Sequence, residues 1–142
     1  MIPAIVIICL LGIGFLLYMF KEAHADRVLF QELAFSHFPK SFGDVKIFFI
    51  SDIHKRKITN KLIDQVKGKV DLVIIGGDLL EKAVPLERVE ENIKKLTEIG
   101  IVYFVWGNND YEADQRILDA LLLKYGVKIL DNTPMFLVVL LA

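Results

Sequence analysis

The sequence predicts an α/β protein built on a parallel β-sheet, and three observations favour this fold class. Four short runs of β-branched and aromatic residues recur along the chain, at 45–50, 71–75, 101–106 and 127–130. The segments between them carry apolar residues at helical spacing. The runs themselves are apolar throughout, which is typical of parallel strands buried on both faces. Strands that alternate with helices indicate βαβ units with right-handed crossovers.

The chain opens with an apolar run, residues 2–20, that contains no charged side chain. Nineteen residues at about 1.5 Å each give roughly 28 Å, which is enough to cross a bilayer core. We therefore expect residues 1–20 to form one transmembrane anchor. A cleaved signal peptide, a lipoprotein signal and a buried core helix are the alternatives, but no small-residue cleavage site precedes Lys21 and Cys9 lies in mid-run. The positive charges that follow favour a single-pass protein whose domain is cytoplasmic.

Composition limits the class of the remainder. At 142 residues the chain has room for about one domain. Its formal net charge of −1 disfavours nucleic-acid binding, which usually needs a basic surface. One cysteine allows neither an internal disulfide nor a cysteine-based zinc site. Residues 21–44, which include Pro39 and Gly43, are predicted to connect the anchor to the domain.

Apolar residues recur at helical spacing in three segments, at 58–66, 86–99 and 113–122. Thr59 is suited to cap the first predicted helix, and Pro85 suits the first turn of the second. A glycine follows each segment, as is usual where a helix ends.

Polar residues follow three consecutive predicted strands. The motifs are SDIH at 51–54, GGD at 76–78 and GNND at 107–110. Because ligands of parallel sheets gather at the carboxyl ends of the strands, these motifs should bring four donor side chains to one edge. The four are Asp52, His54, Asp78 and Asn108.

These donor types suit divalent metal ions. In an extended backbone, Asp52 and His54 would present their side chains on the same side, because they are two residues apart. A carboxylate such as Asp78 can bridge two cations, and such a pair can bind a phosphate and lower the pKa of a bridging water. The amide oxygen of Asn108 would add a neutral ligand.

Each motif alone has a simpler explanation. Asp52 to His54 could be a surface turn with a helix cap, and Gly-Gly-Asp is a common strand-to-turn signal. Asp110 could cap a helix that starts near Ala113. The basic stretch 55–57 suits a phosphate, an anionic membrane surface or a solvated loop, and Glu81 is expected at the surface. The order of the motifs on consecutive strands favours a shared site.

The motifs resemble those of the calcineurin-like metallophosphoesterases. Asp-x-His is followed about 25 residues later by Gly-Asp, and some 30 residues further by Gly-Asn-x-Asp. The similarity covers about residues 41–133. The stretches ISDIHKR, IIGGDLLEKAVPLERVEENI and VYFVWGNNDYE look like a bacterial, membrane-anchored branch of the family.

The resemblance implies that residues 45–142 are the N-terminal half of a four-layer α/β/β/α sandwich. It also implies hydrolysis of phosphate mono- or diesters at a dinuclear site for two divalent ions, such as Mn, Fe, Zn or Mg. In that site Asp52 and His54 would hold one metal, Asp78 would bridge both, and Asn108 would hold the second.

The chain departs from the family pattern in two ways. The family histidine that contacts substrate is Asn109 here, so the predicted catalytic residue can donate a hydrogen bond to a phosphate but cannot act as a general acid. No histidine follows His54, so the later histidine and the Gly-His-x-His motif of the family are absent.

Two functions therefore stay open. The chain is either a truncated, membrane-tethered phosphoesterase, or a non-catalytic remnant or interaction module that keeps the first half of the fold. A second chain or the missing C-terminal half would complete the enzyme. The apolar run 135–142 fits one more buried strand or a truncated reading frame, and the sheet face that should meet the second sheet would be exposed.

Overall fold

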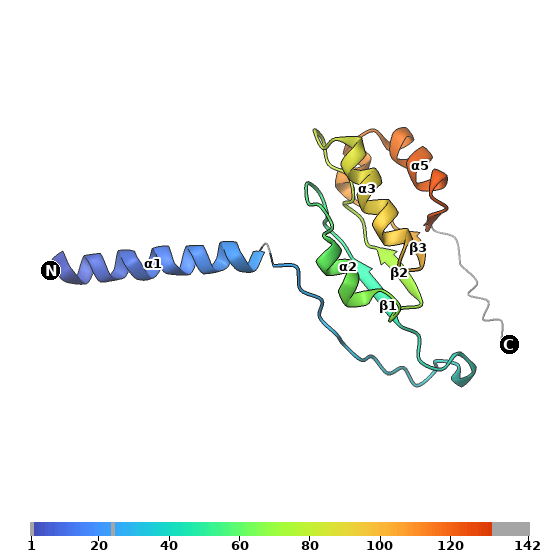
Figure 1. Ribbon diagram of the computed structural model, residues 1–142, viewed down its shortest axis with the longest axis horizontal. Helices are drawn as coiled ribbons and strands as arrows, with labels where there is room; N and C mark the ends of the chain where they lie inside the picture. Colours follow the sequence, from blue (N-terminus) through green and yellow to red (C-terminus); the bar gives the residue numbers. More distant parts are fainter. Residues whose placement is uncertain (1, 24, 132–142) are drawn as a thin grey trace.

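The computed structural model of the protein describes residues 2–23 and 25–131 (Figure 1). The apolar run 135–142 lies outside the described residues. The elements are, in chain order, α1 (Ile2–Ala23), the short 3-10 helix η1 (Lys40–Phe42), β1 (Ile47–Ile50), α2 (Asn60–Val66), β2 (Leu72–Ile75), α3 (Leu86–Thr97), β3 (Ile101–Phe104), α4 (Asn108–Glu112), α5 (Gln115–Lys124) and β4 (Lys128–Ile129).

The four strands form one parallel sheet in the order β1-β2-β3-β4. Each strand lies inside a run that the sequence predicts, so the α/β class and the parallel sheet are confirmed. Equivalent residues stand side by side: Ile47 pairs with Leu72, and Leu72 pairs with Ile101. All four carboxyl ends consequently point to the same edge of the sheet.

One face of the sheet packs against α2, α3 and α5 (Figure 1). The strand residues on this face, such as Val73, Ile75 and Phe104, are fully buried. Thr59 caps α2 as predicted, because its hydroxyl oxygen accepts a hydrogen bond from the Leu62 N–H at 3.2 Å. The result is a two-layer body with a single apolar core.

The opposite face carries exposed apolar side chains. In β1, Ile47 is 50% exposed and Phe49 is 62% exposed, and Ile101 of β3 is 52% exposed. The prediction that the strands are buried on both faces is therefore wrong for β1, whereas in β2 and β3 Leu72 and Tyr103 are buried on this face as well. The exposed apolar side chains agree with the expectation that the face meant for a second sheet would be exposed. Successive side chains of a strand point to opposite faces, and the described helices contribute their buried residues to the core on one face only.

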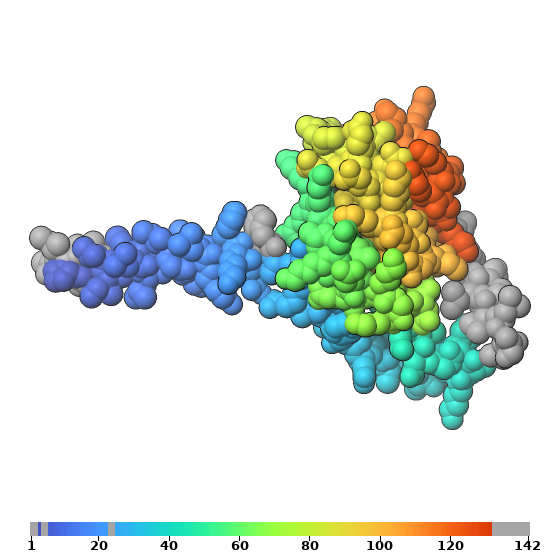
Figure 2. Space-filling view, viewed as in Figure 1, coloured from blue at the N-terminus to red at the C-terminus, as the bar shows by residue number. Residues whose placement is uncertain are grey.

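Helix α1 stands apart from this body (Figure 2). Its large apolar side chains between Val6 and Phe20 are at least half exposed. Nevertheless, no helix in the described part of the chain combines the length and the apolar character that a bilayer crossing needs. The membrane span predicted over residues 2–20 is therefore not confirmed.

The segment after α1 contacts the α/β body at both of its ends. Near the start, Asp26 accepts a hydrogen bond from the Thr59 hydroxyl at 2.8 Å, and Val28 packs against the core. Just before β1, the Lys46 N–H donates to the Asp71 carboxylate at 2.7 Å. The start of the connector predicted over 21–44 thus lies against the domain, whereas residues 29–41 are exposed, and the boundaries of the connector stay a prediction.

Candidate metal centre

The loops that follow β1 and β2 are joined by backbone hydrogen bonds beyond the strands. The Asp52 N–H donates to the Gly77 carbonyl at 3.2 Å, and the His54 N–H donates to the Asp78 carbonyl at 3.0 Å. Ile53 lies between the two donors and is only 3% exposed, so it anchors the first loop in the core. Two segments that are distant in sequence are thereby fixed side by side.

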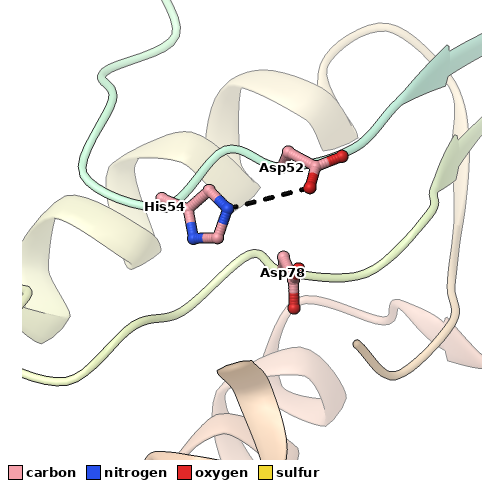
Figure 3. A group of neighbouring side chains, drawn as sticks. All are labelled: Asp52, His54 and Asp78. Atoms are coloured by element: carbon pink, nitrogen blue, oxygen red, sulfur yellow. Dashed lines mark ion pairs between the residues drawn. The ribbon is translucent and has the colours of Figure 1, made fainter. Parts of the chain in front are cut away.

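These loops bring together three of the predicted donors, Asp52, His54 and Asp78 (Figure 3). One ligand atom from each lies within 4.8 Å of the others. The Nε2 atom of His54 is 3.7 Å from Asp52 Oδ1. Carboxylate and imidazole groups at this spacing are donors that Zn²⁺, Mn²⁺ and Fe²⁺ bind in proteins, so the donor set fits a divalent cation.

All three donors have left-handed backbone conformations. The φ angles are 54° for Asp52, 48° for His54 and 54° for Asp78. The expectation of an extended Asp-x-His segment is therefore wrong, and the loops, rather than strand alternation, turn the side chains together. Non-glycine residues in this region cost of order 1–3 kcal/mol each and concentrate at functional sites.

The loops after β2 and β3 approach each other closely at Gly107. A Cβ atom at this position would lie 2.3 Å from both the backbone nitrogen and Oδ1 of Asp78. A Cβ at Gly77, where φ is +90°, would lie 2.8 Å from the Gly107 Cα. Glycine is therefore required for the backbone contact that places Asp78 against the third loop.

Asp110 ties the same two loops together through its buried carboxylate. Oδ2 accepts hydrogen bonds from the Asp78 N–H at 2.8 Å and the Gly107 N–H at 2.9 Å, and Oδ1 accepts one from the Leu80 N–H at 2.7 Å. Burial raises the pKa of Asp110, although these three donors act to lower it. Asp110 does not cap a helix near Ala113, because that helix, α5, is capped by Asp114.

Asn108 and Asn109 begin α4, a short helix that the spacing of apolar residues does not predict. Asn108 is exposed. Asn109 donates its backbone N–H to Asp78 Oδ1 at 2.9 Å and lines an open pocket of 490 Å³ together with Asp52 and His54. The loop after the third strand therefore reaches the centre through Asn109.

Helix α3 holds the loop that continues from His54. The buried side chain of Asn92 accepts the Ile58 N–H and donates to the Arg56 carbonyl, both at 2.9 Å. Arg88 donates to the Lys55 carbonyl at 2.9 Å. These contacts satisfy backbone groups that no strand pairs. The sequence does not predict them, because an asparagine inside an amphipathic helix gives no sign of its partner.

A parallel sheet that gathers carboxylates and an imidazole beyond its carboxyl ends is typical of metal-dependent enzymes. The calcineurin-like phosphoesterase family model matches residues 45–141. The chain belongs to this family, as its motifs predict. The shared α/β fold of the described residues is consistent with the N-terminal half of a metallophosphoesterase.

The chain is also similar to the uncharacterized protein YpbG of Bacillus subtilis (strain 168). The two are 52% identical over 88 residues, which cover 61% of this chain and 34% of that relative. The matched part thus spans about a third of the relative's length.

Proposed function

We propose that the protein is a metal-dependent phosphoesterase that hydrolyses phosphate mono- or diesters at a centre held by Asp52, His54, Asp78 and Asn108. One observation carries the proposal: donor atoms of Asp52, His54 and Asp78, which come from two different loops, lie within 4.8 Å of one another. Family membership supports the reaction class. Two divalent ions, with Asp78 as the bridging ligand, are proposed by analogy with the family.

Divalent cations, when bound here, would polarise a phosphoryl oxygen and make water more acidic. The residues of the chain would set the geometry. Asp78 is oriented by the Asn109 N–H on Oδ1 and by the approach of Gly107. The backbone of His54 is held by the hydrogen bond from its N–H to the Asp78 carbonyl. These constraints keep the donors in place before a substrate arrives, which is how a site avoids reorganisation during the reaction.

Asn109 is proposed to position the substrate. It lines the pocket that contains Asp52 and His54, and its side-chain amide can donate a hydrogen bond to a phosphate oxygen. An amide does not protonate a leaving group near neutral pH. We therefore propose a preference for esters with good leaving groups, such as aryl phosphates.

The hydrolysis of bis(4-nitrophenyl) phosphate by the full chain with Mn²⁺ tests this function. We expect turnover that a chelator abolishes, and a loss of activity of more than about 100-fold in Asp78→Ala. Even the loss of a residue that hydrogen-bonds to a metal ligand costs about 10–100-fold in affinity or activity. Asp64→Ala, at an exposed position of α2, is the matched control. Turnover that survives in Asp78→Ala would contradict the proposal.

The alternative, a non-catalytic remnant or interaction module, rests on two observations. Asn109 stands where the family has a histidine that contacts substrate, and an apolar sheet face that includes Phe49 is exposed. Uptake of metal without any hydrolysis would support this alternative. Restored hydrolysis on adding a second chain or a C-terminal half would instead support the truncated enzyme.

The membrane location, with the domain in the cytoplasm, stays a prediction. Alkaline carbonate extraction of expressing cells would test it by comparing the full chain with a version in which Leu11 and Leu16 of α1 are replaced by lysine. Extraction of both forms into the soluble fraction would contradict the prediction.

A further inference from the structure

Glu81 lies against His54 from the loop after β2. Its Oε2 atom is 3.5 Å from His54 Nδ1, and its Oε1 atom is 3.2 Å from Lys55 Nζ. The carboxylate is about two-thirds buried, with 32% of the side chain exposed. Glu81 follows Asp78 by three residues. The loop that supplies Asp78 therefore also places a carboxylate beside the ring of His54, at the nitrogen that faces away from Asp52.

The two nitrogens of the His54 ring face different surroundings. Nε2 faces Asp52 Oδ1 at 3.7 Å, on the side of the candidate centre. Nδ1 is buried and has no hydrogen-bond partner among the residues that the structure describes. A neutral imidazole carries one N–H and one lone pair, so the group beside Nδ1 decides which nitrogen is left to bind a cation.

We propose that Glu81 is a positioning residue whose carboxylate accepts the Nδ1–H of His54 and so leaves the Nε2 lone pair directed at the centre. Histidines that bind metals commonly donate their second ring N–H to a carboxylate or carbonyl, which fixes the tautomer and the ring orientation. The 3.5 Å separation is longer than a formed hydrogen bond, and such bonds often tighten only when the site is filled. The inference rests on the proposed metal centre.

The ion pair with Lys55 gives Glu81 a second role that must be separated from the first. Lys55 is 66% exposed, and exposed ion pairs contribute little to structure. If Glu81 served only to hold Lys55, removing either residue would have the same effect. If Glu81 positions His54, only changes at Glu81 should disturb the ring.

The test combines two measurements on the full chain: the ¹⁵N chemical shifts of the His54 ring without metal at alkaline pH, and calorimetric titration with Zn²⁺. We expect the wild type to hold the Nδ1–H tautomer and Glu81→Ala to populate the Nε2–H form. We expect Glu81→Ala to weaken Zn²⁺ binding by about 10–100-fold. Glu81→Gln, which keeps an acceptor oxygen at the same reach, should recover most of this loss.

Two controls make the result specific. Lys55→Ala and Glu112→Ala should each keep a Zn²⁺ affinity within about threefold of the wild type, a smaller change than the 10–100-fold expected for Glu81→Ala. Lys55 is exposed, and Glu112 pairs with Lys82 at the surface. If Glu81→Ala does not fold, Glu81→Asp, whose carboxylate falls short of Nδ1, replaces it. An unchanged His54 tautomer in Glu81→Ala, or a loss of Zn²⁺ affinity in Lys55→Ala equal to that in Glu81→Ala, would overturn the inference. A wild type that takes up no Zn²⁺ contradicts the proposed function, whereas the metal-free tautomer still decides the role of Glu81.

Discussion

Asp110→Ala removes one carboxylate and leaves three N–H groups without their acceptor, the buried one of Leu80 and the partly buried ones of Asp78 and Gly107. A hydrogen bond to a charged group contributes roughly 1.5–3 kcal/mol, so three would contribute roughly 5–9 kcal/mol. Part of this is offset because the buried carboxylate regains its hydration on unfolding, which is worth several kcal/mol. We expect a net loss of about 3–4 kcal/mol in the free energy of unfolding, a large single-residue effect.

Urea unfolding followed by circular dichroism would measure this loss. Mild detergent should be present because α1 exposes apolar side chains. Asp114→Ala is the control, since Asp114 caps α5 with one hydrogen bond to the Ile117 N–H at 3.3 Å and should cost about 1 kcal/mol. The reasoning fails if Asp110→Ala is no more destabilising than Asp114→Ala.

Three further predictions follow from the geometry. Gly107→Ala should weaken metal binding by at least about tenfold, because the new Cβ would lie 2.3 Å from atoms of Asp78. Gly14→Ala in α1, where a Cβ meets no other atom within 4 Å, should leave the affinity unchanged. Equal metal affinities of the two variants in calorimetry would contradict this prediction. Asn92→Ala should lower the free energy of unfolding by about 2–3 kcal/mol, since one buried and one partly buried hydrogen bond to the loop after β1 are lost. An unchanged urea midpoint would contradict this. The side-chain hydrogen bond from Lys124 lowers the pKa of Glu90 from 4.5 to about 2, so its stabilising effect is present above pH 4.5 and is lost as the pH falls toward 2. Glu90→Gln should therefore flatten the acid-side fall in melting temperature, and parallel curves for the two proteins would count against it.

The fold was largely predictable from the sequence because its signals are local. Apolar runs such as VKIFFI mark buried strands, and a threonine before an amphipathic segment marks the start of a helix. Three of the four predicted donors could be grouped for a similar reason, since parallel strands end at one edge. The apolar run alone does not predict that Phe49 is exposed, because composition does not say which face a neighbouring layer covers; the expectation of an exposed sheet face came from the family resemblance.

The details of the site depend on contacts between distant residues. No sequence pattern predicts the left-handed conformation of Asp52, because this conformation depends on the backbone hydrogen bond to Gly77 in the loop after β2. Asp110 and Glu81 stand among ordinary turn and surface residues, and their roles appear only when their partners in other segments are known. The one available hint was that both follow a predicted ligand by two or three positions.

Anomalous scattering from crystals grown with Zn²⁺ would test the central claim most directly. The account predicts an anomalous peak about 2.0–2.2 Å from a carboxylate oxygen of Asp52, from His54 Nε2 and from a carboxylate oxygen of Asp78. Peaks that lie only at other residues, or no peak near these three side chains in the presence of excess zinc, would contradict the account.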